Sequence, residues 1–121
     1  MNPLIWVAVM LIGGVGSVLR FLIDRAVSRR TRRPFPLGTM VVNVSGATVQ
    51  GFLTGLALSA VTGLLAGTAF IGAYTTFSTW ILETQRLGEE RRLVAAVANI
   101  VVTVALGLGA AAAGMWVGIR W

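Results

Sequence analysis

Hydroxyl and aromatic side chains gather in one short stretch, residues 72–80, within a run that is otherwise apolar. Four of its nine residues are Ser or Thr and three are aromatic: Thr75, Thr76, Ser78, Thr79, Tyr74, Phe77 and Trp80. A simple membrane anchor has Leu and Val at such positions, and polar groups at bilayer depth are costly enough to indicate a role. The stretch is therefore a candidate site, although these residue types alone name no reaction.

A second polar group, the Asn43 amide, lies in another apolar run, residues 37–58. Its NH₂ offers two donors, and an unpaired amide in hydrocarbon is costly. The amide must therefore face protein or a water-filled path. An interhelical hydrogen bond explains Asn43 as well as a pore does, and both interpretations stay open. Further along, Asn99 and Thr103 share a helical face that can meet this polar cluster or only pack against it.

The chain contains no cysteine and no histidine, which removes thiol chemistry and the commonest transition-metal ligands. Its four carboxylates all lie outside the middle of the apolar runs: Asp24, Glu83, Glu89 and Glu90. We therefore expect the protein not to be an enzyme. The formal charge of +6 comes from arginines between apolar runs, which is typical of membrane orientation signals and not of nucleic-acid binding.

The elements that must position these groups are membrane helices. Of the 121 residues 56% are hydrophobic and 12% charged, whereas soluble domains carry about twice that charge. Four apolar runs are long enough to cross a bilayer: residues 4–23, 37–58, 64–82 and 93–119. The sequence predicts an all-α membrane protein of one domain, residues 1–121, with polar connections at 24–36 and 83–92.

The third predicted helix contains the residues that disfavour helix most. Gly72 and the Ser, Thr and aromatic residues after it are poor helix formers. A break there frees backbone carbonyls, which is how ion sites arise at membrane depth. The alternative is an intact helix whose hydroxyls bond back to its own carbonyls, and composition alone slightly favours it.

Arginine is distributed unevenly between the two sides of the predicted bundle. With four helices, the first and third connections lie on the same side. That side carries eight of the ten arginines: Arg25, Arg29, Arg30, Arg32, Arg33, Arg86, Arg91 and Arg92. Arginine-rich connections stay in the cytoplasm, so both termini are expected outside.

Three stretches, taken in order, resemble the motifs of the small fluoride channels, the FluC family. They run from Gly13 to Phe21, from Gly38 to Gly46 and from Gly72 to Trp80. The third keeps a Thr-Thr-Phe-Ser-Thr core. Each stretch is a weak signal alone, but the three together in a four-helix chain of this length are specific. The resemblance spans essentially all four predicted helices.

The resemblance implies a passive fluoride-specific channel in the cytoplasmic membrane that exports fluoride and limits its toxicity. It also implies an antiparallel, dual-topology dimer with two fluoride paths and a structural sodium ion held centrally at the interface. In that family the third helix is broken near its middle, and carbonyls at the break bind the sodium. The matching positions in this sequence are Gly72 and Thr75.

The same resemblance implies a role for side chains along the path. Asn43 matches the pore asparagine, and Phe77 matches the first of two phenylalanines whose electropositive ring edges face the anion. Trp80 stands where the second phenylalanine usually lies, and an indole still offers a ring edge and an N–H donor. A track of hydroxyls is matched by Thr76, Ser78, Thr79 and Thr103. Polar positions near the pore mouths are matched by Arg20 and Glu83.

Residue chemistry suits such an ion. Fluoride is small and tightly hydrated, and a dry path must replace its water with close donors. Amide N–H groups, hydroxyls and ring edges do so without trapping the ion against a full opposite charge. A central cation lowers the cost of bringing an anion to that depth.

The arginine bias bears on the partner subunit. An antiparallel homodimer needs a chain that inserts in both orientations, whereas the uneven arginines favour one orientation. An oppositely oriented homologue is therefore the expected partner, with a homodimer left open.

Two other functions fit part of the pattern. A small four-helix multidrug-type transporter needs a membrane-embedded carboxylate, and the first predicted helix has none. A non-transporting membrane subunit explains the glycines and Asn43 as packing features, but not the hydroxyl and aromatic cluster. Measurement of ion flux separates these functions.

Overall fold

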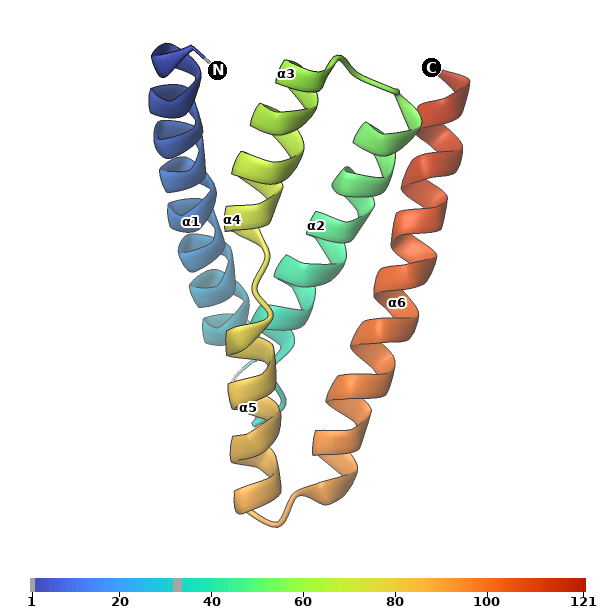
Figure 1. Cartoon of the computed structure of the whole chain (residues 1–121). Coiled ribbons are helices and arrows are strands. Elements are labelled where there is room, and N and C mark those ends of the chain that lie inside the picture. Colours follow the sequence, from blue (N-terminus) through green and yellow to red (C-terminus); the bar gives the residue numbers. More distant parts are fainter. Residues whose placement is uncertain (1, 32–33) are drawn as a thin grey trace.

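The computed structural model describes residues 2–31 and 34–121, and these residues form helices and connections without any strand. The elements in chain order are α1 (Pro3–Thr31), α2 (Leu37–Gly55), α3 (Ala60–Gly63), η1 (Leu64–Ile71), α4 (Gly72–Tyr74), α5 (Ser78–Glu89) and α6 (Leu93–Arg120). Figure 1 shows both termini at the same end of the molecule. Met1 and two arginines of the first predicted connection, Arg32 and Arg33, lie outside the described residues.

Three stretches of the described chain are long and apolar enough to cross a membrane. They are Pro3–Thr31, Ala60–Glu89 and Leu93–Arg120. These stretches confirm the prediction of an all-helical, multi-pass membrane protein. α2 has 19 residues, but Asn43 and Gln50 lower its hydropathy, so its membrane crossing stays a prediction.

The two predicted polar connections, residues 24–36 and 83–92, are longer than the connections in the structure. Residues 24–31 continue α1, and Glu83 to Glu89 belong to α5, so charged side chains occupy helix ends and not loops. Charged residues with long side chains are good helix formers and reach water from a helix end. Hydropathy alone therefore places the ends of both helices too early, at residues 23 and 82, whereas α1 ends at Thr31 and α5 at Glu89.

Close backbone contact between α2 and α6 forms one half of the molecule. A side chain at Gly51 would collide with the Ala111 carbonyl, and one at Gly114 would collide with the Thr48 carbonyl. Small residues permit this approach, which maximises van der Waals contact between membrane helices. Because α2 carries Asn43, the tight packing fixes the height of that amide in the bundle.

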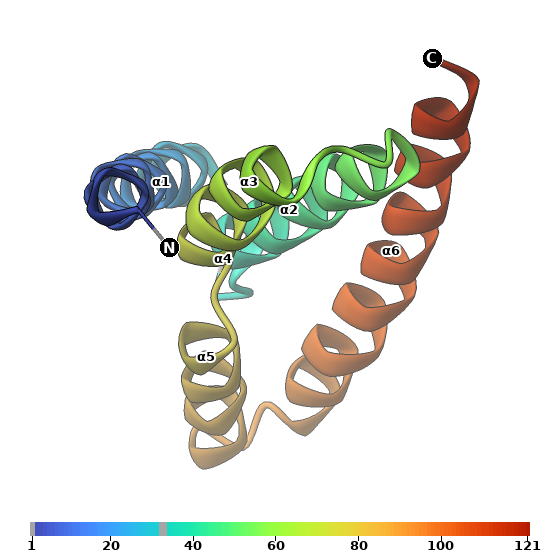
Figure 2. The same ribbon diagram turned by 45° about the horizontal axis from the view of Figure 1, so that its top comes forward.

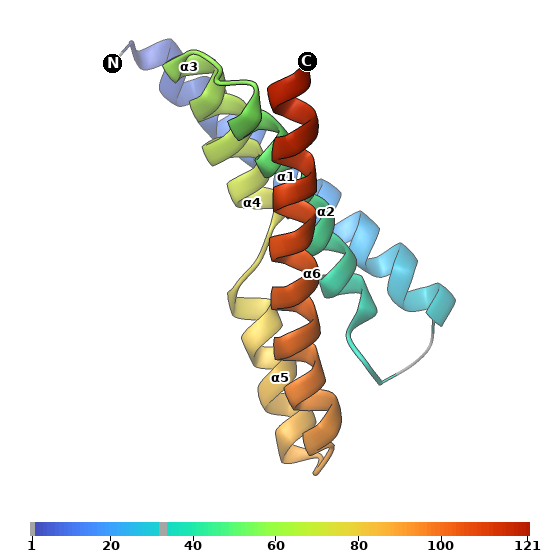
Figure 3. The same cartoon turned by 90° about the vertical axis from the view of Figure 1, so that its right-hand side faces the viewer.

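The other half is built by α1 against η1 and α4. Gly16 is buried at this contact, where an added Cβ would lie 2.6 Å from the Phe70 carbonyl oxygen. Figure 2 shows α1, the α3–α4 segment and α2 side by side, with α5 set apart from them and α6 meeting α2 at the far end of the row. Figure 3 shows α5 running beside the lower half of α6, which it meets through the loop at residues 90–92.

The third membrane segment is interrupted at residues 75–77. Thr75 is extended, with φ −82° and ψ 162°, and α5 begins only at Ser78. Gly72 itself is helical, with φ −59° and ψ −38°, so the interruption begins three residues later than the residue expected to weaken the helix. The intact-helix interpretation is therefore wrong. The wider π-helical winding of η1, just before the break, was not predicted.

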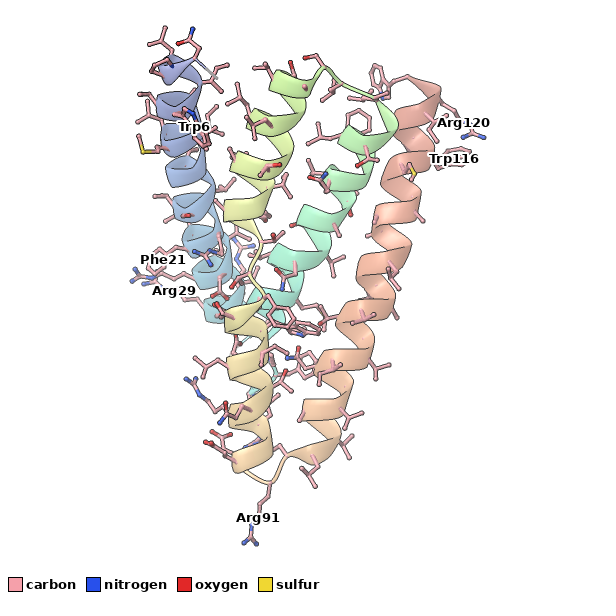
Figure 4. All side chains as sticks on the ribbon, in the orientation of Figure 1. Trp6, Phe21, Arg29, Arg91, Trp116 and Arg120 are labelled. Atoms are coloured by element: carbon pink, nitrogen blue, oxygen red, sulfur yellow. The ribbon has the colours of Figure 1, made fainter. Side chains whose placement is uncertain are left out.

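Figure 4 labels side chains at both ends of the bundle, and Phe21 and Arg29 between them. Arg91 lies at the lower end, and Trp116 and Arg120 lie at the upper end. Arg120 stacks over the Trp116 ring at 4.0 Å. Such aromatic and basic pairs are typical of the membrane–water interface.

Candidate functional site

Asn43 joins α2 to the interruption between α4 and α5. Its Nδ2 donates to the Thr76 carbonyl at 2.8 Å, and its Oδ1 accepts from the Thr76 N–H at 2.8 Å. The amide thus satisfies a backbone unit that has left the helix. The interhelical hydrogen bond, one of the two sequence interpretations, is present, and the second hydrogen of Nδ2 is left over for another acceptor.

The carbonyls of Gly72 and Thr75 lose their usual helical donors. The Thr76 N–H, which would bond to Gly72 in a continuous helix, goes to Asn43. The Thr79 N–H, which would bond to Thr75, goes to the Thr76 hydroxyl at 3.2 Å. Both carbonyl oxygens are therefore available to another ligand.

A small hard cation such as sodium suits two such oxygens, because unwound backbone carbonyls coordinate ions of this kind. Within residues 2–31 and 34–121, no three Asp, Glu, His or Cys side chains come together to hold a metal. The donor set in the described chain is thus a backbone one, and it fits sodium better than a transition metal.

A cavity of about 390 Å³ lies beside the interruption, between α2, α5 and α6. Its lining includes six residues that the sequence analysis singled out: Asn43, Thr75, Thr76, Phe77, Trp80 and Thr103. The cavity therefore unites residues from three separate parts of the chain.

Two of the lining residues differ sharply in exposure. The Phe77 ring is 72% exposed and meets Trp80 edge to face, with ring centroids 5.7 Å apart. Thr103 is only 7% exposed, and its buried hydroxyl has no partner within the described chain. A buried hydroxyl without a partner is costly and indicates a missing ligand or water.

A second cavity, of about 220 Å³, lies on the other side of Thr76. Its lining includes Arg20, Asp24, Thr39 and Thr79. The Thr76 hydroxyl bonds to the Thr79 hydroxyl at 3.1 Å, so a pair of hydroxyls lies between the two cavities. Arg20 supplies the only formal positive charge among the lining residues described for this cavity.

Glu83 hydrogen-bonds to Thr39, which is 2% exposed. It also lines a third cavity, with Arg86 and Glu90. The Thr39–Glu83 pair thus lies between the second and third cavities. Sequence reasoning missed Thr39, although its position four residues before Asn43 on one helix was a usable signal.

Two predicted positions stand apart from these cavities. Gly72 and Ser78 are exposed and line none of the three cavities, although Ser78 directly follows Phe77 in the chain. Both lie on the surface of this single chain.

Trp80 uses its N–H within the protein. The indole nitrogen donates to the Asn99 carbonyl at 3.1 Å, so the donor that the sequence left free for an anion is occupied. Trp80 still lines the 390 Å³ cavity beside the interruption. Asn99 bonds through its side chain to Thr84 at 2.9 Å, while Thr103, one turn later, lines the same cavity as Asn43.

The sequence matches the family model described as CrcB-like protein, camphor resistance, over residues 7–115. The Fluoride-specific ion channel FluC 2 of Mycobacterium tuberculosis (strain ATCC 25618 / H37Rv) is 66% identical over 113 residues, covering 93% of this chain and 90% of that protein. The protein of the same name from Mycolicibacterium paratuberculosis is 75% identical over 108 residues, covering 89% and 88%. The Fluoride-specific ion channel FluC 1 of Leifsonia xyli is 44% identical over 124 residues, covering 98% and 89%.

Proposed function

The chain belongs to the CrcB-like protein family, and from this membership we propose that it is a fluoride-specific ion channel. The channel lets fluoride leave the cell passively across the cytoplasmic membrane and so limits its toxicity. The observation that carries the proposal is the close similarity, over nearly the whole chain, to proteins named fluoride-specific ion channels. An ion channel of this kind is not an enzyme.

The 390 Å³ cavity beside the interruption supports the proposal through the groups that line it. Asn43, which has a second N–H to donate, and the exposed Phe77 ring line it, and the lining residue Thr103 adds a buried hydroxyl without a partner in the described chain. Together they replace the water of a small anion without presenting a full positive charge, and so allow it to leave again. Thr76 and Thr79 continue the hydroxyls toward Arg20 and the second cavity. The Thr39–Glu83 pair lies beyond it.

We further propose a structural sodium ion at the Gly72 and Thr75 carbonyls. The two freed oxygens support it, and so does the exposure of Gly72, which leaves room for ligands from a second subunit. A monovalent cation there lowers the electrostatic cost of an anion in the neighbouring cavity.

The proposed assembly is an antiparallel, dual-topology dimer of four-helix subunits. α2 is taken as the fourth crossing, because it packs against the membrane-length helix α6. The exposed positions at the interruption, Gly72, Phe77 and Ser78, lie on the surface that a second subunit covers. The two termini at one end of the molecule suit an even number of crossings, and the arginine bias places that end outside.

The same bias makes an oppositely oriented homologue the favoured partner, with a homodimer as the alternative.

To test the function, the wild-type chain is purified with and without a coexpressed homologue from its own organism and is reconstituted in liposomes. Fluoride release is then followed with a fluoride electrode, using chloride as the control anion. Release of fluoride but not chloride supports the function, and absence of fluoride release in both preparations overturns it.

A further inference from the structure

Three hydrogen bonds form a closed loop between the first turns of α5 and the body of α6. The Trp80 indole N–H donates to the Asn99 carbonyl at 3.1 Å, and the Asn99 amide donates to the Thr84 hydroxyl at 2.9 Å. That hydroxyl in turn donates to the Trp80 carbonyl at 2.8 Å. Both the side chain and the backbone of Trp80 are thus tied, directly or through Thr84, to one residue of α6.

No other hydrogen bonds join α5 to α6 in residues 78–89 and 93–120. Asn99 is 0% exposed, which protects the loop from competing water. Just before α5, the Thr76 N–H has left the helical pattern and bonds to Asn43 instead of the Gly72 carbonyl. The start of α5 therefore depends on this loop for its position beside α6.

Trp80 in turn contacts the Phe77 ring and helps to orient it. The Phe77 ring is largely exposed, and its aromatic partner is Trp80, with ring planes inclined at 72°. Edge-to-face pairs of this kind favour a definite arrangement of the two rings. A displacement of the indole is therefore passed on to the Phe77 ring at the cavity.

We propose that Thr84 and Asn99 are positioning residues, which hold the Phe77–Trp80 ring pair at the cavity and so determine how readily the anion passes it. The inference rests on the proposed channel function and extends it to two residues outside the predicted path. An indole N–H is needed for this arrangement, since a phenylalanine ring has no donor for the Asn99 carbonyl.

The test replaces Thr84 by Val, which keeps the shape of the side chain and removes its hydroxyl. Thr84→Ser keeps the hydroxyl and serves as the rescue variant. Thr54→Val is the matched control, because Thr54 also bonds to the carbonyl four residues earlier, at 2.9 Å, but makes no hydrogen bond to another helix. The variants are made in the full chain, assembled as the wild type is.

The first readout is the fluorescence of Trp80 in a chain whose other tryptophans, Trp6, Trp116 and Trp121, are replaced by Phe. Thr84→Val is expected to lower the anisotropy of the Trp80 emission, because Asn99, whose carbonyl accepts the indole N–H, loses its side-chain bond to α5, whereas Thr84→Ser and Thr54→Val leave it unchanged. An unchanged anisotropy in Thr84→Val overturns the inference. This readout decides the inference whether or not the wild-type chain conducts fluoride.

The second readout is fluoride efflux from liposomes. Thr84→Val is expected to slow efflux about fivefold, the effect of losing roughly one hydrogen bond, and Thr84→Ser to restore it. In a Trp80→Phe background the same change should cause little further loss, because the indole bond is already gone. Equal losses in both backgrounds indicate that Thr84 acts on the fold alone, and they overturn the inference.

The two failures are distinguishable. A wild-type chain without fluoride efflux, alone and with its homologue, overturns the proposed function while the anisotropy still tests the position of the ring. If Thr84→Val does not fold, Thr84→Ala removes the same hydroxyl with less bulk and takes its place in both readouts.

Discussion

Asn43 uses both ends of its amide on Thr76, so one side chain holds the interruption against α2 and still has one N–H left. The alternatives drawn from the sequence, an interhelical bond or a path-lining donor, are therefore compatible in one residue. An amide is well suited to this, since it donates and accepts at the same time without a charge.

Replacing Asn43 by Ala is expected to abolish most fluoride efflux, because the interruption loses both its anchor and a donor. The two lost hydrogen bonds also reduce the free energy of unfolding by about 2 kcal/mol. Efflux from liposomes and thermal unfolding in detergent measure the two effects. Unchanged efflux in a folded Asn43→Ala variant would contradict the path assignment.

Replacing Phe77 by Ile removes the ring edge at the cavity while keeping an apolar side chain. Since this ring is exposed, the fold is expected to survive and fluoride efflux to fall by at least about tenfold, roughly the worth of one aromatic contact. Phe52→Ile is the matched control, because Phe52 packs edge to face on Trp121 and lines no part of the cavity. Equal effects of the two changes would contradict a specific role for Phe77.

At the scale of single residues, the sequence identified many of the polar groups now found together, since costly polar groups in apolar runs are conspicuous. It did not identify Thr39 or Thr84. Their hydrogen bonds to Glu83 and Asn99 follow only from the packing of the helices. It also left the Trp80 N–H free, because the Asn99 carbonyl is a backbone group of another helix and has no signature in composition.

Among the elements, the α2–α6 pair has the least tolerance for added volume. A Cβ added at Gly114 would lie 3.0 Å from the Phe52 backbone nitrogen and would collide with the Thr48 carbonyl oxygen. Gly109 on the same helix has open space at its Cβ. The two glycines thus provide a comparison between packing and helix propensity.

Gly114→Ala is expected to lower the free energy of unfolding by about 1–3 kcal/mol, because backbone atoms of α2 must move away. Gly109→Ala should be neutral or slightly stabilising, since alanine favours helix. Thermal unfolding of both variants in the same detergent provides the measurement. A larger loss in Gly109→Ala than in Gly114→Ala would contradict the packing seen between α2 and α6.

Element boundaries show where sequence patterns stop being informative. Apolar runs located all the long helices, but α1 continues through charged residues to Thr31, where hydropathy predicted a connection. The interruption starts at Thr75 and not at Gly72, because it depends on Asn43 in another helix. A tertiary hydrogen bond of this kind overrides local propensity, which is why propensity alone slightly favoured an intact helix.

For the whole molecule, the uneven arginines lead to a prediction about insertion. A lone wild-type chain is expected to place both termini outside, as accessibility of terminal tags in intact cells will show. Replacing Arg29, Arg30, Arg91 and Arg92 by Gln should produce both orientations, because the bias is reduced. Both orientations in the unchanged chain would favour the homodimer.

Sodium is expected to stabilise the proposed assembly. Exchanging sodium for a large organic cation should slow fluoride efflux and lower the unfolding temperature, since ligands that bind only the folded state stabilise it. The two measurements are made at equal ionic strength. Insensitivity of both to the cation would contradict a site at the Gly72 and Thr75 carbonyls.

The interruption at residues 75–77 also bears on how this protein persists in a cell. In hydrocarbon, each backbone carbonyl without a partner is penalised, and a single chain has two, at the exposed Gly72 and the half-buried Thr75. If the chain works as the proposed dimer, a subunit without its counterpart is thus a strained species in the bilayer, open to degradation. The supply of the second subunit then sets how much of this chain survives, and synthesis of the two must be matched.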